Sequence, residues 1–224
     1  MPFRDREEAA LLLAKRLRRY RGENPLVLAI PRGAVPMAKI IAAALDGEVD
    51  VVLVRKLGAP GQPELAIGSV EESGKIYLSE AVDELDIHSD YITAETRRQL
   101  DTLRKRRMLY TPRRRPVDPS GRIVIVVDDG VATGATMIAA LRAIRAKNPK
   151  RLVAAVAVAP PRTLQRVARE ADEVVCLKTP YYFSAVGEFF VDFSQISDED
   201  VIQMLRENRV ESADTASRRA SALR

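Results

Sequence analysis

The 224-residue sequence is poor in side chains that build disulfides and metal clusters. It has one cysteine (Cys176), one histidine (His88) and no tryptophan. A single cysteine cannot form a disulfide within the chain, and a lone histidine cannot assemble a metal cluster. No apolar run approaches the ~18–20 residues of a membrane-spanning helix, and the N-terminus lacks the apolar segment and cleavage pattern of a signal peptide. We therefore expect a soluble protein of the reducing cytoplasm, with no membrane partner.

The positive charge of the chain is concentrated in one segment. The chain has 36 Lys and Arg against 31 Asp and Glu, a formal net charge of +5. Residues 97–115 hold nine basic residues with Asp101 as their only acid, which leaves the rest of the chain slightly acidic. We interpret 97–115 as a charged helix with a solvated face and expect no nucleic-acid partner. The alternative is a regulator that binds nucleic acid or a protein through this segment.

Short apolar runs alternate with helical patterns along most of the chain. The expected strands are 26–30, 51–54, 123–127, 152–158 and 174–177, and the expected helices between them are 37–45, 136–146 and 162–169. Continuous apolar strands alternating with helices are typical of a mostly parallel sheet flanked by helices. We predict one α/β domain over residues 1–208 and a flexible C-terminal tail over 209–224.

Three segments stand outside this alternation. The first residues predict an amphipathic helix capped by Asp5. Residues 58–74 contain four glycines and two prolines, which favour a mobile, irregular loop with room for a short hairpin. Residues 91–110 predict a long charged helix that ends before Pro112.

The strongest functional pattern follows the strand 123–127. Two adjacent acids, Asp128 and Asp129, end the strand, and the small-residue loop Ala132–Thr136 leads into a helix. Backbone N–H groups at a helix N-terminus suit a phosphate, and neighbouring carboxylates suit the hydroxyls of a sugar or a divalent cation. The pattern GxxxxGK[ST] is excluded because Ala135 follows Gly134, and no GxGxxG follows a strand. The pattern therefore favours a sugar phosphate over a nucleoside triphosphate.

This segment resembles the signature DDxxxTGxT of the type I phosphoribosyltransferases, which Asp128, Asp129, Thr133, Gly134 and Thr136 match. The resemblance implies that Asp128 and Asp129 bind the ribose hydroxyls of phosphoribosyl pyrophosphate (PRPP). It also implies that the loop Ala132, Thr133, Gly134, Ala135 and Thr136 binds its 5′-phosphate. The segments PRGAVPMA, VRKLGAPGQPELAIGSV and AVGEFFVDFSQISDEDVI extend the similarity to a group of uncharacterised bacterial predicted phosphoribosyltransferases, over residues 5–206.

The resemblance also implies a pyrophosphate site and a reaction. Arg32 and Gly33 lie in the position of the family's pyrophosphate loop, which often holds a strained peptide bond, and Arg55 and Lys56 in the position of its basic contact. Residues 58–74 take the place of its flexible catalytic loop. The implied enzyme transfers the 5-phosphoribosyl group from PRPP to a nitrogenous base or amine, with Arg55, Lys56, Asp128 and Asp129 as catalytic residues. Its cofactor is Mg²⁺, carried by PRPP with help from Asp128 and Asp129, and the family often forms homodimers.

The acceptor is less defined by the sequence. Six of the 11 aromatic residues lie in 181–193, within a hood that we expect to comprise residues 178–208 and the N-terminal helix. From the resemblance we predict that Tyr182 and Phe183 bind the acceptor, with packing inside the hood as the alternative. Family members that act on 6-oxopurines carry an acid just before the TG, where this chain has Ala132. An adenine-like, pyrimidine-like or unrelated amine acceptor remains open.

Overall fold

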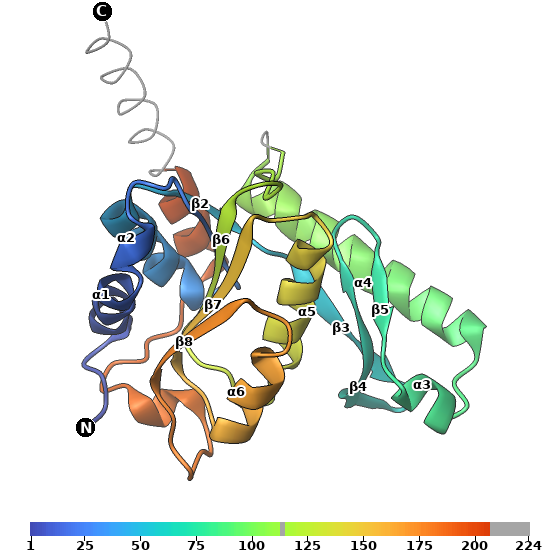
Figure 1. The fold of residues 1–224 in the computed structure, drawn as a ribbon. Helices are drawn as coiled ribbons and strands as arrows, with labels where there is room; N and C mark the ends of the chain where they lie inside the picture. Colours follow the sequence, from blue (N-terminus) through green and yellow to red (C-terminus); the bar gives the residue numbers. More distant parts are fainter. Residues whose placement is uncertain (113–114, 207–224) are drawn as a thin grey trace, which may run out of the picture.

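A parallel sheet of five strands forms the centre of the computed structural model, which describes residues 1–112 and 115–206 (Figure 1). Its spatial order is β2-β1-β6-β7-β8. In chain order these strands are β1 (Leu26–Ala29), β2 (Glu48–Val51), β6 (Ile123–Asp128), β7 (Arg151–Val158) and β8 (Glu173–Lys178). All four pairings are parallel, so the carboxyl ends of the strands meet at one edge. The predicted parallel α/β fold is confirmed, whereas the predicted tail 209–224 lies outside the described residues.

Helices cover both faces of this sheet (Figure 1). One face carries α1 and α2 and the other carries α5 and α6, which span Arg6–Arg16, Ala34–Leu45, Ala135–Arg145 and Pro161–Val167. Successive strand residues point to opposite faces. Val27 and Ile125 therefore join the core beneath α1 and α2, while Leu26 and Val124 join the core beneath α5 and α6. Burial on both faces explains why β1, β6 and β7 are apolar runs in the sequence.

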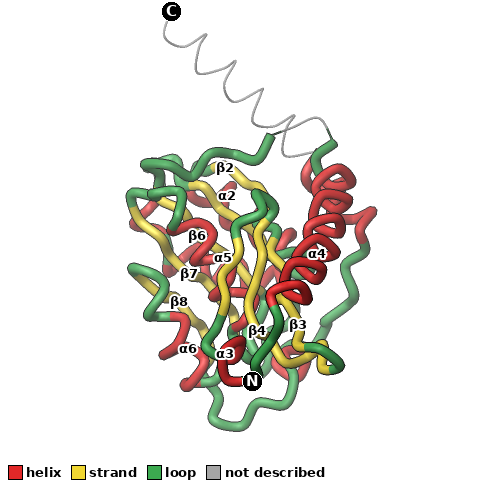
Figure 2. Tube along the Cα trace, turned by 90° about the vertical axis from the view of Figure 1, so that its right-hand side faces the viewer, coloured by secondary structure: helices red, strands yellow, loops and turns green. Residues whose placement is uncertain are grey.

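A second, antiparallel sheet lies between α5 and a long helix, α4 (Figure 2). Its strands are β3 (Val54–Ala59), β4 (Gln62–Glu71) and β5 (Ile76–Leu78), and α3 (Ala81–Glu84) connects it to α4 (Ser89–Tyr110). The expected single strand over 51–54 is therefore wrong. Its first residue ends β2 of the parallel sheet and its last begins β3 of the other sheet. The β-branched residues of this run predict a strand, but they do not indicate that its two ends belong to different sheets.

The segment 58–74 is more regular than the sequence predicts. Most of it belongs to β4, which pairs with both β3 and β5. The glycines are accommodated by this pairing. Gly58 lies at a register irregularity where a Cβ atom would come within 2.8 Å of the Pro63 backbone, and Gly61 forms the tight turn with φ of 69°. The glycines and prolines thus form part of a β-hairpin. The mobility of the segment stays a prediction.

The basic helix α4 is only partly solvated. One face of it is buried against β3 and β4, through residues that include Glu95, Gln99 and Leu103. Arg107 donates to both carboxylate oxygens of Glu72 at 2.7 Å, to Asp50 at 3.2 Å and to the carbonyl of Val51 at 3.0 Å. The predicted charged helix with a solvated face is confirmed, because Arg97, Arg98, Arg104 and Lys105 are exposed while the second sheet buries the opposite face. Arg113 and Arg114 lie outside the described residues.

The N-terminus and the residues after β8 pack together. Asp5 accepts a hydrogen bond from the Glu8 N–H at 2.8 Å, which confirms it as the cap of α1. Phe3 forms a parallel bridge with Phe190 directly after the short 3₁₀ helix at Val186–Phe189. Residues 198–206 are helical. Within the part of the chain that the structure describes, no helix is long and apolar enough to cross a membrane.

Candidate active site

The two predicted acids lie at the carboxyl edge of the parallel sheet. Asp128 is the last residue of β6, and its Oδ1 accepts a hydrogen bond from the Asp129 N–H at 2.9 Å. Asp128 is partly buried and Asp129 is buried. Burial raises the pKa of the Asp128 carboxyl, and the neighbouring charge of Asp129 raises it further. The site therefore holds a carboxylate whose negative charge a hydrogen-bond donor or a cation would stabilise.

Arg6, the first residue of α1, binds the second acid. Its Nε lies 2.8 Å from Oδ2 of Asp129, and both side chains are only 12% exposed. The same guanidinium donates to the carbonyl of Ser194 at 2.8 Å and stacks 3.8 Å from the ring centroid of Phe193. Burial raises the pKa of Asp129, and Arg6 opposes that shift. Sequence reasoning missed Arg6 because nothing in the order of the residues connects positions 123 residues apart.

The predicted pyrophosphate loop packs directly against the acid pair. A Cβ atom on Gly33 would come within 2.1 Å of Oδ2 of Asp129, so this position accepts only glycine while the carboxylate stays in place. The peptide bond between Pro31 and Arg32 is cis. The Arg32 guanidinium lies 4.0 Å from Oδ1 of Asp198 in the hood. The β1–α2 loop and the acid pair, predicted separately, are thus neighbours.

The predicted phosphate loop, Ala132–Thr136, connects β6 to the N-terminus of α5. Gly134 has a left-handed φ of 87°, which favours glycine, and α5 begins at the next residue. Two side chains of helix α6 bind backbone carbonyls of this loop. The Thr163 hydroxyl donates to the Ala132 carbonyl at 2.6 Å, and the Arg166 guanidinium donates to the Thr133 carbonyl at 3.1 Å. With these carbonyls turned toward α6, the N–H groups at the start of α5 are available to an anion. The two α6 residues were not identified from the sequence.

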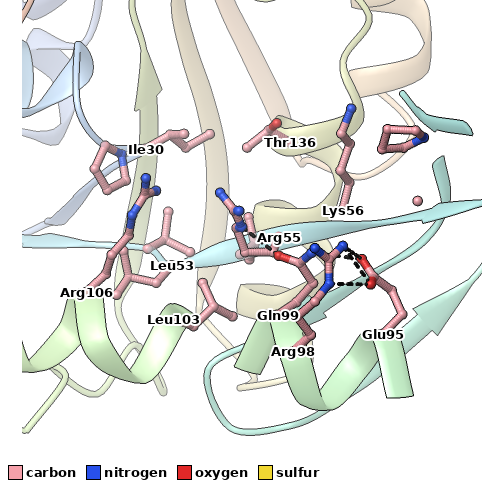
Figure 3. A pocket seen from close by; sticks show the side chains of 15 residues that line it. Ile30, Leu53, Arg55, Lys56, Glu95, Arg98, Gln99, Leu103, Arg106 and Thr136 are labelled. Atoms are coloured by element: carbon pink, nitrogen blue, oxygen red, sulfur yellow. Dashed lines mark hydrogen bonds and ion pairs between the residues drawn. The ribbon is translucent and has the colours of Figure 1, made fainter. Parts of the chain in front are cut away.

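A cavity of about 510 Å³ opens beside these loops (Figure 3). It extends from Pro31 and Thr136 to the predicted basic contacts Arg55 and Lys56. These two residues lie inside β3 of the second sheet, not directly after a strand of the parallel sheet as the sequence suggested. Helix α4 forms the opposite wall with residues that sequence reasoning assigned to no site, namely Glu95, Arg98, Gln99, Leu103 and Arg106.

The predicted acceptor residues occupy different environments. Tyr182 is 94% exposed. Phe183 stacks on Phe189 with ring centroids 5.4 Å apart, and Phe190 stacks on Phe193 at 5.0 Å. Phe190 is buried and Phe189 and Phe193 pack partly buried beside the core, while the role of Tyr182 and Phe183 toward an acceptor stays a prediction.

The carboxyl edge of the sheet thus brings the two acids next to the loop Ala132–Thr136 and against Gly33, and Thr136 and Pro31 of these two loops line the basic cavity. Binding at the carboxyl ends of the strands is the general rule for open α/β sheets.

Comparison with known proteins agrees with this fold. The family model described as the phosphoribosyl transferase domain matches residues 6–193, and the chain therefore belongs to that family. The chain is 41% identical over 204 residues to two Mycobacterium tuberculosis proteins, from strains CDC 1551 and H37Rv, that carry the provisional name phosphoribosyl transferase. The matched region covers 91% of this chain and 46% of each relative, so the chain spans about half the length of these curated relatives.

A solved structure is also similar. The crystal structure of the protein TT1426 from Thermus thermophilus is 46% identical to this chain, with a TM-score of 0.84. The match covers 92% of this chain and 99% of that one.

Proposed function

We propose that the domain over residues 1–208 transfers the 5-phosphoribosyl group from PRPP to a nitrogenous base or amine and releases pyrophosphate. The observation that carries this proposal is the meeting of three segments: Asp128 and Asp129 directly precede the loop Ala132–Thr136, and Asp129 packs against Gly33. Thr136 of that loop and Pro31, beside Gly33, line the same cavity as Arg55 and Lys56. A ribose phosphorylated at both ends needs donors for two anions and acceptors for the hydroxyls between them. Such an enzyme would act in cytoplasmic nucleotide metabolism, and we expect a homodimer.

Each part of PRPP has a matching group in this arrangement. The N–H groups of Ala132–Thr136 would hold the 5′-phosphate at the start of α5. Asp128 would accept the ribose hydroxyls, because Arg6 already engages Oδ2 of its neighbour Asp129. Arg32 and Gly33 would approach the pyrophosphate from one side, and Arg55 and Lys56 from the other.

The donor set fits Mg²⁺ carried with the substrate. Among residues 1–112 and 115–206, no group of three or more His, Cys, Asp and Glu residues could hold a metal. Mg²⁺ commonly binds one or two carboxylates together with substrate phosphates, and Asp128 with Asp129 supplies that share. Bound there, Mg²⁺ would neutralise charge on the leaving pyrophosphate. The raised pKa of Asp128 is in accord with a carboxylate that gains from a nearby cation.

The residues of the chain would act mainly through charge and position. During transfer the bond between ribose C1 and the pyrophosphate oxygen breaks, the oxygen keeps the electron pair, and C1 bonds to the acceptor nitrogen. Negative charge at Asp128 and Asp129 would stabilise the positive charge that develops on the ribose ring, and Arg55 with Lys56 would stabilise the departing anion. Loss of one such preorganised contact is expected to cost about 2–4 kcal/mol in the transition state.

The acceptor would bind on the hood side of the ribose. We propose Tyr182 and Phe183 as its aromatic wall, with the exposed ring of Tyr182 closing over a planar base. Ala132 offers no carboxylate there, which disfavours 6-oxopurines. A screen of nucleobases and amines with Mg²⁺ and PRPP, read as pyrophosphate release, would identify the acceptor.

Calorimetric titration with PRPP and Mg²⁺ tests the donor site. We expect Asp128→Asn combined with Asp129→Asn to weaken PRPP binding at least tenfold, because the hydroxyl acceptors lose their charge. Asp101→Asn is the matched control, since Asp101 is an exposed acid on α4, and it should bind PRPP like the unaltered protein. Undiminished affinity in the double variant would remove the assignment of this site.

A further inference from the structure

Helix α4 contributes cations to the cavity beside the pyrophosphate loop. The charged residues that line the cavity are four cations and one carboxylate: Arg55, Lys56, Arg98, Arg106 and Glu95. Figure 3 shows the guanidinium groups of Arg55 and Arg106 directed into the cavity, one from β3 and one from α4. Two like charges facing one space favour an anionic ligand between them.

The single carboxylate of this cavity is already engaged. Glu95 accepts two hydrogen bonds from Arg98, at 2.8 and 2.9 Å, and one from the Gln99 amide at 2.8 Å. The Gln99 carbonyl oxygen in turn accepts a hydrogen bond from Nε of Arg55 at 2.9 Å. These hydrogen bonds orient Arg55 through the neutral amide of Gln99. The positive charge of Arg55 therefore has no direct carboxylate partner among the residues that line the cavity. Burial and the charges of Arg106 and Arg98 lower the pKa of Arg55.

Arg106 differs from the basic residues beside it in sequence. Arg107 is bound by Glu72 and Asp50, and Arg104 and Lys105 are exposed. Arg106 is half-buried at the cavity wall and has no hydrogen-bond or ion-pair partner among residues 1–112 and 115–206. A half-buried guanidinium without a partner is costly unless a ligand supplies the missing acceptors.

Arg106 also lies near the pyrophosphate loop. The hydroxyl of Tyr110, one turn further along α4, donates to Oδ1 of Asp198, the same oxygen that lies 4.0 Å from Arg32. The charges of Arg106 and Arg32 both act on this phenol. Arg106 and Arg32 thus both lie near Tyr110, and Arg106 with Pro31, the neighbour of Arg32, lines the cavity.

We infer that Arg106 binds the pyrophosphate group of the sugar donor together with Arg55, so that the rigid helix α4 forms a wall of the pyrophosphate site. This inference rests on the proposed function and adds a residue from an element that no motif in the sequence marks. Thr136 of the predicted phosphate loop and Pro31 of the predicted pyrophosphate loop line the same cavity as the two arginines. A donor held by its 5′-phosphate at this loop would therefore place its pyrophosphate in the cavity that Arg106 lines. A guanidinium binds two phosphate oxygens at once, which suits a pyrophosphate better than a monoanion.

Calorimetric titrations of Arg106→Ala with three probes test this inference: PRPP, inorganic pyrophosphate and ribose 5-phosphate, each with Mg²⁺. We expect at least a tenfold loss of affinity for PRPP and pyrophosphate, the scale of one charge-assisted contact. Ribose 5-phosphate should bind within about twofold of the unaltered protein, because it lacks the group that Arg106 contacts. Lys105→Ala removes the same charge from the neighbouring exposed position and should change none of the three affinities.

The outcomes separate the inference from the proposed function. If the unaltered protein binds PRPP and Arg106→Ala binds it equally well, the inference is overturned and the proposed function stands. If the unaltered protein binds pyrophosphate in an Arg106-dependent way but does not bind PRPP, the proposed function fails and the anion site stands. If Arg106→Ala does not fold, Arg106→Gln, which keeps most of the side-chain volume, replaces it with the same expected losses.

Discussion

Replacing Arg6 with methionine removes the ion pair that holds Asp129 in the site. The Nε–Oδ2 distance is 2.8 Å and both side chains are 12% exposed, so the variant leaves a buried carboxylate without its partner. Breaking a buried ion pair from one side costs about 3–5 kcal/mol. We expect about 3 kcal/mol of unfolding free energy to be lost, because some solvent still reaches both groups. In a domain of this size that loss lowers Tm by roughly 6–12 °C.

Urea unfolding at pH 7 measures this loss, and a double-mutant cycle identifies its cause. Arg6→Met combined with Asp129→Asn leaves no uncompensated charge, so it should recover a large part of the stability. Arg104→Met is the control, because Arg104 and Asp101 are 68% and 59% exposed, and its effect should stay within about 0.5 kcal/mol. A loss below about 1 kcal/mol in Arg6→Met, or strict additivity in the cycle, would refute the reasoning.

Three further predictions concern the loops around the acids. Because burial and the charge of Asp129 raise the pKa of Asp128, the folded state favours its protonated form, and stability is lost as pH rises through that raised pKa. Asp128→Asn should therefore raise Tm at pH 7 but leave Tm unchanged below about pH 3.9, the ordinary Asp pKa. Thermal melts that show the same rise in Tm in both pH ranges would contradict this. Gly33→Ala places Cβ 2.1 Å from the Asp129 carboxylate. The variant should lose about 1–3 kcal/mol of unfolding free energy and bind PRPP more weakly. An unchanged unfolding free energy and an unchanged PRPP affinity would show that the loop can move away. Thr163→Val removes the donor to the Ala132 carbonyl and should cost about 1 kcal/mol and weaken ribose 5-phosphate binding; calorimetry that finds normal affinity would show that α6 does not support the loop.

The sequence predicted β1, β6 and β7 of the parallel sheet well because these strands are buried on both faces. A strand such as β7 has only one residue that is not buried, so its apolar run is visible without any knowledge of its neighbours. The second sheet was harder to predict, since β4 contains glycine and proline at positions that only the pairing with β3 and β5 makes tolerable. Its glycines signal a loop in sequence and a close backbone approach in the structure.

The motif residues were predictable for a related reason. Asp128 and Ala132–Thr136 lie within nine consecutive positions, so strand, acids, loop and helix are all local features of one segment. The residues that support them are not local. Arg6 reaches Asp129 from the N-terminal helix, and Arg106 reaches the cavity from a helix whose other basic residues are solvated or buried in ion pairs.

The sequence by itself therefore determined the α/β class, most of the parallel strands, and the acid pair followed by a small-residue loop, because burial and local turn chemistry leave patterns in consecutive residues. Tertiary structure alone decided which charges meet. It paired Arg6 with Asp129, placed Gly33 against the same carboxylate, and separated Arg106 from its neighbour Arg107. The physical reason is that an electrostatic contact depends on distance in space, and a helix of basic residues looks uniform until packing assigns each side chain to a cavity, an ion pair or water.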